Sequence, residues 1–351
     1  MKLSYQTIDL KPIHPFVIAR GGYSQHRNVV VRLTDDDGLE GFGEAAPNRF
    51  YGESVATVVA ALGQFKSLLE RADPFALQLI ESELNRTLRG NASAKSALSS
   101  ALHDLLGKRL GMPIYKIWGL DPTAAPESSF TIAIAENQEL EERVREAADY
   151  PILKIKLGTE RDMEIVRIIR SAAPDKRLRV DANAAWTAKH AVRMSDFLLD
   201  QGVEMLEQPV AANDIEGLRF VRKRAKLPIF ADESCLVATD IPRLAGAVDG
   251  INIKLAKCGS MREALRMVHT ARSLDMQVMA GCMIESSLGI SAISQIAPLL
   301  DSADFDGAAL LSNDPYRGTS IAEGRIRLSS APGLGAVPAP SANLSPAFQS
   351  A

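Results

Sequence analysis

Charged residues end five consecutive apolar stretches of the sequence at a nearly constant interval. Lys156, Asp181, Glu207, Asp232 and Lys254 each close a short apolar run, 22 to 26 residues after the previous one. That interval is the length of one strand-plus-helix unit, and the stretches between the runs have a helical period. Because the carboxyl ends of such parallel strands meet at one mouth of a barrel, the five side chains are predicted to converge there.

Eight apolar runs follow one another in the second part of the chain. Amphipathic stretches such as RDMEIVRIIRSA and REALRMVHTARSL separate them, and this alternation predicts a parallel sheet covered by helices. Eight units fit a closed barrel better than an open sheet, and we place that barrel at residues 125–315. The runs are FTIAI, ILKIKL, RLRVDAN, VEMLEQP, PIFADE, GINIKL, QVMAGCMI and DFDGAAL.

The beginning and the end of the chain have different patterns. Residues 1 to about 50 alternate like antiparallel strands, with a turn at Asp35–Gly38. From Ser54 to about Arg109 the period is helical, so residues 1–115 are predicted to form an α+β domain. The final stretch, PAPSANLSPAFQSA, is rich in Pro, Ser and Ala and is predicted to be a loose tail.

Composition limits the partners and the compartment. The net charge of −3 provides no general attraction to nucleic acid or to anionic membrane surfaces. The three cysteines form no CxxC pair, which is typical of a reducing compartment. The first residues lack the apolar core of a signal peptide, and no apolar run reaches the roughly 20 residues that span a bilayer. We therefore expect a cytoplasmic protein with no nucleic-acid or membrane partner.

The converging side chains predict a specific chemistry. Three carboxylates, from Asp181, Glu207 and Asp232, form an all-oxygen site that favours a hard cation, and we expect one Mg²⁺ per subunit. Lys156 and Lys254 stand on opposite sides, and a partly desolvated lysine near a cation has a lowered pKa and can act as a base. A substrate carboxylate on the metal, with proton removal from the neighbouring carbon, gives an ene-diolate. Two opposed lysines then predict inversion of that carbon.

Each residue alone also has an ordinary interpretation. A single strand-end acid is usually a helix cap or a surface residue, and a single lysine is usually solvated. Five such residues in register favour the functional interpretation. Asp249 and Lys257 are expected to be ordinary surface or loop residues. For Lys154 two possibilities stay open: support of the site through its charge or a substrate contact, or extension of its ammonium into solvent.

Several motifs together resemble the enolase superfamily, in its muconate-lactonising subgroup. They are LKIKLG, RVDANAAW, MLEQP, FADES and NIKLAKCGS, and the resemblance covers nearly the whole chain. It implies a modified (β/α)₇β TIM-like barrel with an α+β capping domain, to which residues 316–351 return. These motifs are specific for the superfamily but not for the reaction, because racemisation, cycloisomerisation and dehydration use the same lysines and metal.

The stretch SADFDGAALL narrows the reaction. Asp304 and Asp306 are two residues apart on one face, and two free carboxylates suit a cationic group on a ligand. This pattern resembles that of dipeptide epimerases, in which it holds the α-ammonium of the N-terminal residue. By the same resemblance Thr131 and Met283 line the substrate pocket. Capping of a turn by the two aspartates, and simple packing of Thr131 and Met283, are the alternatives.

One loop departs from the pattern of Ala-Glu epimerases, which carry a second arginine shortly after the stretch ARG. Here Tyr23 stands at that position, and His26 or Arg27 could take its place. The resemblance thus implies an isomerase that epimerises the C-terminal residue of a dipeptide, with glutamate or another residue at that position. An N-succinylamino acid racemase, o-succinylbenzoate synthase or cycloisomerase, and a non-catalytic metal- or ligand-binding barrel, are the alternatives. A homo-oligomer is expected, and a role in peptidoglycan recycling stays open.

Overall fold

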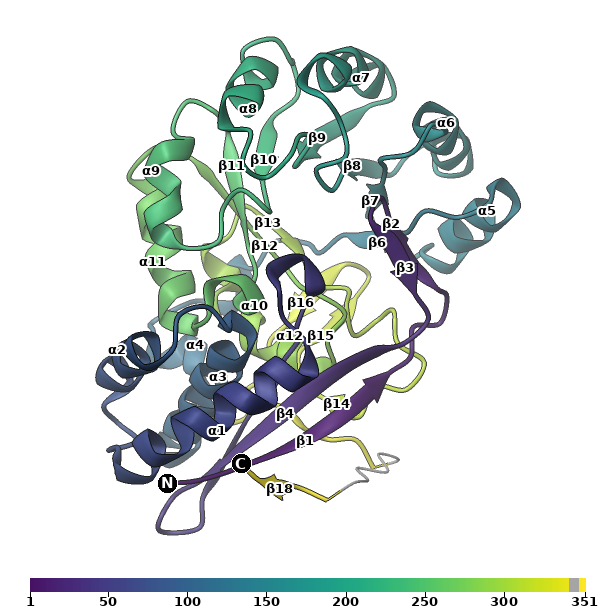
Figure 1. Ribbon diagram of the computed structural model, residues 1–351. Helices are drawn as coiled ribbons and strands as arrows, with labels where there is room; N and C mark the ends of the chain where they lie inside the picture. The colour runs from purple at the N-terminus through teal and green to yellow at the C-terminus, as the bar shows by residue number, and fades with distance from the viewer. Residues whose placement is uncertain (341–346) are drawn as a thin grey trace.

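The computed structural model describes residues 1–340 and 347–351 of the chain (Figure 1). Within them, a parallel sheet surrounded by helices lies beside an antiparallel sheet with helices of its own. The fold class predicted from the sequence, a (β/α)₇β barrel with an α+β cap, is confirmed. No helix among the described residues combines the length and the apolar character that crossing a membrane requires.

The barrel strands follow one another around the sheet in chain order. The backbone N–H of Ser129 donates to Ala303 O at 3.1 Å, which joins the first strand to the last. The strands are β6 (Phe130–Ile132), β7 (Ile152–Lys156), β8 (Arg177–Asp181), β9 (Val203–Glu207), β10 (Ile229–Ala231), β11 (Gly250–Ile253), β12 (Gln277–Gly281) and β13 (Ser302–Asp304). The helices between them are α5 (Asn137–Glu146), α6 (Asp162–Ala172), α7 (Ala188–Asp200), α8 (Ile215–Arg222), α9 (Ile241–Leu244), α10 (Leu255–Cys258), α11 (Met261–Arg272) and α12 (Ser287–Ser294).

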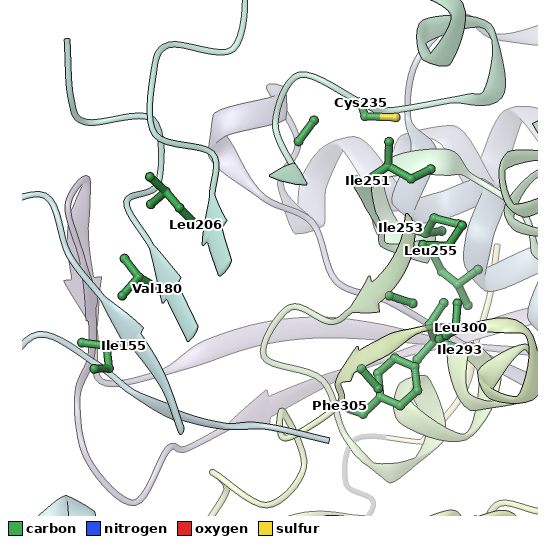
Figure 2. Close-up of a cluster of buried hydrophobic side chains, with 14 of the residues drawn as sticks. Ile155, Val180, Leu206, Cys235, Ile251, Ile253, Leu255, Ile293, Leu300 and Phe305 are labelled. Atoms are coloured by element: carbon green, nitrogen blue, oxygen red, sulfur yellow. The ribbon is translucent and has the colours of Figure 1, made fainter. Parts of the chain in front are cut away.

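Alternation along the strands separates an apolar outer face from a polar interior. Figure 2 shows Ile155, Val180 and Leu206 on three neighbouring strands; they belong to the core that the strands share with the surrounding helices. The next residue of each strand, Lys156, Asp181 and Glu207, has the opposite direction and points into the barrel. A small apolar cluster of the inward-facing Met205, Phe230 and Met279 fills part of the interior. The polar residues are therefore concentrated at the carboxyl ends of the strands.

The cap is built on a four-stranded sheet in the order β18-β1-β4-β5. Its strands are β1 (Lys2–Leu10), β4 (His26–Thr34), β5 (Glu40–Ala45) and β18 (Gln349–Ser350), and its helices are α1 (Val55–Arg71), α2 (Leu77–Thr87), α3 (Ala92–Leu110) and α4 (Ile114–Ile117). Helix α3 lies against β5 so closely that a Cβ at Gly43 would be 2.0 Å from Ala97 O. Glycine is needed at this crossing because any side chain would force the helix away from the sheet.

A short hairpin leaves the cap and extends toward the barrel (Figure 1). It consists of β2 (Phe16–Ile18) and β3 (Gly21–Tyr23), and Val17 O accepts a hydrogen bond from Ile134 N at 3.0 Å. The turn η1 (Arg49–Tyr51) follows β5. Both segments reach the mouth of the barrel.

The end of the chain differs in part from the predicted loose tail. Residues 341–346 lie outside the described residues, but β18 pairs antiparallel with β1. The Phe348 ring packs against Phe42, and the Arg32 guanidinium lies 4.4 Å from its centre. These contacts and the unpaired edge of β1 explain the ordered end, which composition alone does not reveal. The remaining short elements are β14 (Tyr316–Arg317), β15 (Ser320–Ala322), β16 (Arg325–Arg327), β17 (Val337–Pro338), η2 (Pro122–Ala124), η3 (Ala238–Asp240) and η4 (Ala297–Leu299).

Candidate active site

Strand register brings the five predicted charged residues to one level of the barrel. Lys156 pairs with Asp181 across β7 and β8, and Asp181 pairs with Glu207 across β8 and β9. Asp232 and Lys254 directly follow β10 and β11. None of the five is more than 7% exposed to solvent. The structure thus places all five, as the spacing suggested, at the carboxyl ends of neighbouring strands.

The three carboxylates lie close enough to share one cation. One oxygen from each of Asp181, Glu207 and Asp232 lies within 4.8 Å of the others. Asn183 supports Asp181, with its backbone N–H at 2.8 Å from Oδ1 and its side-chain amide at 3.2 Å from Oδ2. Asn252 donates to Glu207 Oε1 at 2.7 Å. These donors fix the orientation of the Asp181 and Glu207 carboxylates.

Two observations indicate that this set fits a divalent cation. Its ligands are carboxylate oxygens alone, the donor type that Mg²⁺ prefers. Asn183 Oδ1 and Asn252 Oδ1 are buried, and among the described residues no hydrogen-bond donor meets them. Buried polar atoms without partners are uncommon, and here they surround the carboxylate cluster.

Electrostatics in the cluster also favour a cation. Burial, and then the charge of Asp181, raise the pKa of Glu207 to about 7. Burial acts against ionisation of Asp181 as well, but the ammonium groups of Lys156 and Lys154 lower the pKa of Asp181 to about 2. A bound divalent cation would keep all three acids ionised.

The loops that carry the ligands are held in unusual backbone conformations. Asn183, Ala184 and Gln208, just after β8 and β9, have φ values of 44°, 65° and 34°. The Gln208 side chain accepts from Asp232 N at 2.9 Å and donates to Ser234 Oγ at 2.8 Å. It therefore ties the loop after Glu207 to the loop after Asp232. Such left-handed residues carry strain that surrounding structure must hold in place, which is typical of functional sites.

Lys156 and Lys254 contact this cluster from opposite sides. Lys156 Nζ lies 2.7 Å from Asp181 Oδ2, and Lys254 Nζ lies 2.8 Å from Asp232 Oδ2. Their strands, β7 and β11, are four steps apart in the eight-stranded order and so face each other across the barrel. Gly281 lies beside Lys254 and Asn252, and a Cβ there would be 3.1 Å from Asn252 Oδ1.

The expected lowering of the lysine pKa is not found for Lys254 in this structure. Burial does lower its pKa, but the negative charge of Asp232, close to its ammonium, more than offsets burial and raises it. The expected lowering follows from a nearby cation and from desolvation, whereas the ion pair with Asp232 becomes visible only in the fold. A cation on the same carboxylate would weaken that pair.

The structure decides between the two possibilities for Lys154. Its side chain is 1% exposed, so it does not reach solvent. Nζ lies 2.7 Å from Glu207 Oε2, 2.8 Å from Asp304 Oδ2 and 3.5 Å from Asp181 Oδ2. Although burial opposes it, these carboxylates raise the pKa of Lys154 well above its usual value. Lys154 is a charged link between the cluster and β13.

The expectation of an ordinary surface or loop position was wrong for Lys257. Its side chain is fully buried and forms an ion pair with Asp232. A lone lysine in a sequence is most often solvated. Its partner Asp232 is 25 residues away, so the motif around Lys257 does not indicate the ion pair. Asp249 lies away from the cluster; it accepts from Arg222 Nε at 2.8 Å and from Ile229 N at 2.9 Å.

Asp304 and Asp306 lie beside the cluster, but Asp304 is not a free carboxylate. Ser129 Oγ donates to Asp304 at 2.7 Å, and Lys154 Nζ donates to it as well. Both donors come from segments that are distant in the sequence, so the stretch around Asp304 does not indicate them. Asp306 accepts from Thr131 N at 2.6 Å. Burial, and then the charge of Asp304, raise the pKa of Asp306 to about 7. Thr131 is buried, and Met283 is partly buried with its sulfur 3.8 Å from Asn48 Nδ2 of the cap.

Tyr23 lies at the outer lip of the site with 49% of its surface exposed. Its ring contacts His26 edge-on at 5.8 Å, and the Arg49 guanidinium lies 5.8 Å from its centre. Burial lowers the pKa of His26 to about 4, so this imidazole is neutral at pH 7. Arg27 pairs with Asp9 at 2.7 Å. Neither residue supplies a free charge in place of the expected arginine.

Arg20 is a contact residue that sequence reasoning missed. From the β2–β3 hairpin it donates to Asn183 O at 2.5 Å and to Glu233 Oε1 at 2.7 Å. The Phe50 ring covers its guanidinium at 4.3 Å. The hairpin is thereby attached to the loops that follow Asp181 and Asp232. Only its position in ARG and the acid that follows Asp232 hint at this contact.

Comparison with protein families gives two matches along the chain. Residues 4–119 match the family described as mandelate racemase/muconate lactonizing enzyme, N-terminal domain. Residues 136–342 match the family described as enolase C-terminal domain-like.

Three similar proteins have names that share one reaction, epimerisation. The chain is 40% identical to an L-Ala-D/L-Glu epimerase of Bacteroides thetaiotaomicron over 95% of this chain and 87% of that protein. It is 39% identical to an L-Ala-D/L-amino acid epimerase of a Maribacter species over 92% of this chain and 95% of that protein. The crystal structure of an Enterococcus faecalis dipeptide epimerase, complexed with Mg and L-Leu-L-Tyr, superposes with a TM-score of 0.90 at 33% identity and covers 95% of this chain and 98% of its own.

Proposed function

The chain belongs to the mandelate racemase/muconate lactonizing enzyme family of the enolase superfamily, and from that premise we propose that it is a Mg²⁺-dependent dipeptide epimerase. Within that proposal the reaction inverts the α-carbon of the C-terminal residue. The observation that carries it is the opposition of Lys156 and Lys254, each paired with a different acid of one carboxylate cluster. A site that only binds a ligand needs no basic group on both sides.

Asp181, Glu207 and Asp232 would hold the cation. When bound, Mg²⁺ supplies positive charge that attracts a substrate carboxylate and stabilises the negative charge left after an α-proton is removed. A bound cation would also change the pKa of Lys254 through Asp232. With Mg²⁺ bound, Asp232 would share its charge with the cation, and the pKa of Lys254, which Asp232 raises, would fall toward the range that a base requires.

The two lysines divide the proton transfers between them, one as a neutral amine and the other as an ammonium. Nζ of one lysine accepts the α-proton, and Nζ of the other donates a proton to the opposite face of the same carbon. The roles exchange when the substrate has the other configuration. Lys154, charged and held among Glu207, Asp304 and Asp181, adds fixed positive charge beside the carbon that becomes electron-rich.

Asp306 and Asp304 are our candidates for the α-ammonium of the dipeptide. Asp306 is aligned by Thr131 N, and its raised pKa makes a cationic partner favourable, because the partner's charge stabilises the ionised form. Asp304 already shares its charge with Lys154, so Asp306 carries most of this interaction. N-succinylamino acids have no free α-ammonium, which makes them the poorer fit.

The lip of the site favours an apolar or aromatic C-terminal residue over glutamate. Tyr23 and Phe50 expose 49% and 42% of their surfaces there. Arg20 and Arg27 are engaged in ion pairs, and His26 is neutral at pH 7. Arg49, over the Tyr23 ring, is the remaining candidate for a side-chain carboxylate. The names of similar proteins include both L-Ala-D/L-Glu epimerase and hydrophobic dipeptide epimerase.

The test is proton exchange at the α-carbon. The protein is incubated with Mg²⁺ in D₂O with a panel of L-Ala-X dipeptides and a panel of N-succinylamino acids, and deuterium is read by mass spectrometry. We expect exchange and inversion at residue X, with hydrophobic X above Glu. Exchange with N-succinylamino acids alone would assign the chain to the racemase reaction instead.

Lysine variants test the mechanism in the same assay. Lys156→Ala and Lys254→Ala should each lose epimerisation by roughly 10²–10⁴-fold, the usual contribution of a positioned acid–base group. Each should still exchange the α-proton of one substrate epimer, because the lysine facing that proton remains. The exposed Lys226→Ala serves as the matched control and should retain full activity. Full turnover by either active-site variant would contradict the two-lysine scheme.

A further inference from the structure

Lys257 carries a buried ammonium that the mechanism above does not use. It lies on α10, the single helical turn that follows Lys254, and its side chain is fully buried. Nζ donates to Asp232 O at 2.7 Å, to Asn252 O at 2.8 Å and to Cys235 O at 3.1 Å, and it also bonds Asp232 Oδ1. Four oxygen atoms therefore surround one ammonium directly beneath a proposed cation ligand.

The helical turn explains how two lysines reach the same aspartate. Lys257 N donates to Lys254 O at 2.9 Å, and Gly259, with φ of +83°, ends the turn. The turn places Lys254 and Lys257 on different sides of the Asp232 carboxylate. Oδ2 bonds Lys254, and Oδ1 bonds Lys257. The two oxygens thus have separate cationic partners.

We infer that Lys257 is a positioning residue that holds Asp232 for the cation, an inference that rests on the proposed function. It bonds the carboxylate, the backbone carbonyl of the same residue and the carbonyl of Cys235, so both the side chain and the turn after β10 are fixed. With Oδ1 bonded to Lys257, Oδ2 is the oxygen that contacts Lys254. Partners of this kind align a ligand and raise metal affinity, and their loss typically costs about 10–100-fold in affinity.

A role in stability alone predicts a different outcome. Replacing a buried ammonium by an apolar side chain of similar size can be neutral or destabilising, depending on the groups left unpaired. Either change affects the unfolding transition of the whole chain. A positioning role instead changes cation affinity in a protein that is still folded. Metal binding therefore separates the two roles.

The experiment titrates Mn²⁺ into the purified proteins and follows free Mn²⁺ by electron paramagnetic resonance. Lys257→Met should weaken Mn²⁺ binding by about 10–100-fold with an unchanged circular dichroism spectrum. Lys95→Met is the matched control, because Lys95 is a buried lysine of the cap that bonds Asn85 Oδ1 and Leu88 O and contacts none of the carboxylates. It should bind Mn²⁺ like the unmodified chain.

A second variant distinguishes the lost ammonium from a disturbed core. In Lys257→Ala the cavity admits small alkylammonium ions, and n-propylammonium should restore part of the Mn²⁺ affinity, whereas n-propanol should not. A folded Lys257→Met or Lys257→Ala protein that binds Mn²⁺ within about threefold of the unmodified chain overturns the inference. Failure of both variants to fold, even with n-propylammonium, also overturns it, because it assigns the lysine to folding itself.

Kinetics provide an independent readout. Weakened metal binding predicts that the activity of Lys257→Met recovers as Mg²⁺ is increased, while Lys254→Ala stays inactive at every Mg²⁺ concentration. If no dipeptide is turned over by the unmodified chain but Mn²⁺ affinity still falls in Lys257→Met, the proposed function fails and the positioning role stands. If dipeptides are turned over and Mn²⁺ affinity does not change in Lys257→Met, the proposed function stands and the positioning role fails.

Discussion

At the scale of single residues, the mouth of the barrel contains buried ammonium and carboxylate groups that form ion pairs. An isolated buried charge is strongly unfavourable, and removal of one member of a buried pair commonly costs about 3–5 kcal/mol. Here every ammonium contacts at least one carboxylate, and Lys154 contacts three. These ion pairs offset part of the cost of burying the charged groups. The set comprises Lys154, Lys156, Lys254 and Lys257 against Asp181, Glu207, Asp232 and Asp304.

Glu285 is a buried acid that does not belong to this set, and its raised pKa predicts that the stability of the protein depends on pH. Burial, and then the charge of Glu44, raise its pKa to about 7. Between the unfolded value of 4.5 and about 7 the folded chain holds a proton that the unfolded chain has released, so stability falls as pH rises through this window. Glu285→Gln removes that loss and should become the more stable protein above pH 7, by up to about 3 kcal/mol.

Urea unfolding at pH 5, 6, 7 and 8 measures this difference. The two proteins should be nearly equally stable near pH 5, and the gap should widen up to pH 8. Glu142→Gln, at an exposed position of α5, is the control and should show no trend. A gap that does not change with pH would mean that Glu285 is ionised throughout.

At the scale of elements, the Arg20 side chain attaches the β2–β3 hairpin to the mouth, in addition to the hydrogen bond from Ile134 N to Val17 O. Arg20 contacts the loops after β8 and β10 through Asn183 O and Glu233, and Phe50 covers it. Because these loops also carry two of the proposed cation ligands, the hairpin and the ligands support each other. Loss of this contact frees the cover of the site without touching the lysines.

Arg20→Met should therefore loosen the hairpin and lower kcat/KM by roughly ten- to a hundredfold, as expected for misplaced substrate contacts. Limited chymotrypsin digestion should cut after Tyr23 faster than in the unmodified chain, because local opening becomes easier. Arg27→Met removes an exposed ion pair of the same region and should leave both rates about unchanged. Equal digestion rates for all three proteins would contradict the attachment.

The same elements show what sequence can and cannot predict. Strand ends were predictable because a charge after an apolar run is unusual, and the spacing repeats. Arg20, Gln208 and Lys257 were not, because each looks ordinary beside its own neighbours and meets its partner only through the fold. The β18 pairing was missed for the same reason: a two-residue strand has too little pattern to be recognised.

At the scale of the whole molecule, buried hydrogen bonds join the cap to the barrel. Glu44 of β5 accepts from Ser286 N at 3.1 Å and Gly289 N at 3.2 Å, at the start of α12. Asn28 of β4 donates to Ile284 O at 2.9 Å. An acid at a helix N-terminus is favoured by the helix dipole, which offsets part of the cost of its burial. The loop after β12 thus connects the barrel to the cap, in addition to the hairpin contacts.

Because the cation site belongs to the folded chain alone, Mg²⁺ should stabilise the whole molecule. A ligand at 100 times its Kd adds about 2.7 kcal/mol to the free energy of unfolding. The thermal midpoint should rise with Mg²⁺ concentration and return to its original value with excess EDTA. Asp181→Asn should show no such rise, and NaCl at matched ionic strength should not reproduce it. A midpoint indifferent to Mg²⁺ would argue against the three acids as a cation site.

Because Lys156, Asp181 and Glu207 pair at one level, the effect of an inserted or deleted residue depends on its position relative to the strands. One extra residue inside β8 would reverse the direction of every side chain beyond it and turn Asp181 toward the helices. One extra residue in the turn at 173–176, before the strand, would leave the paired positions where they are. Insertions and deletions are therefore tolerable in the turns that precede the strands and destructive within them, whatever the inserted amino acid is.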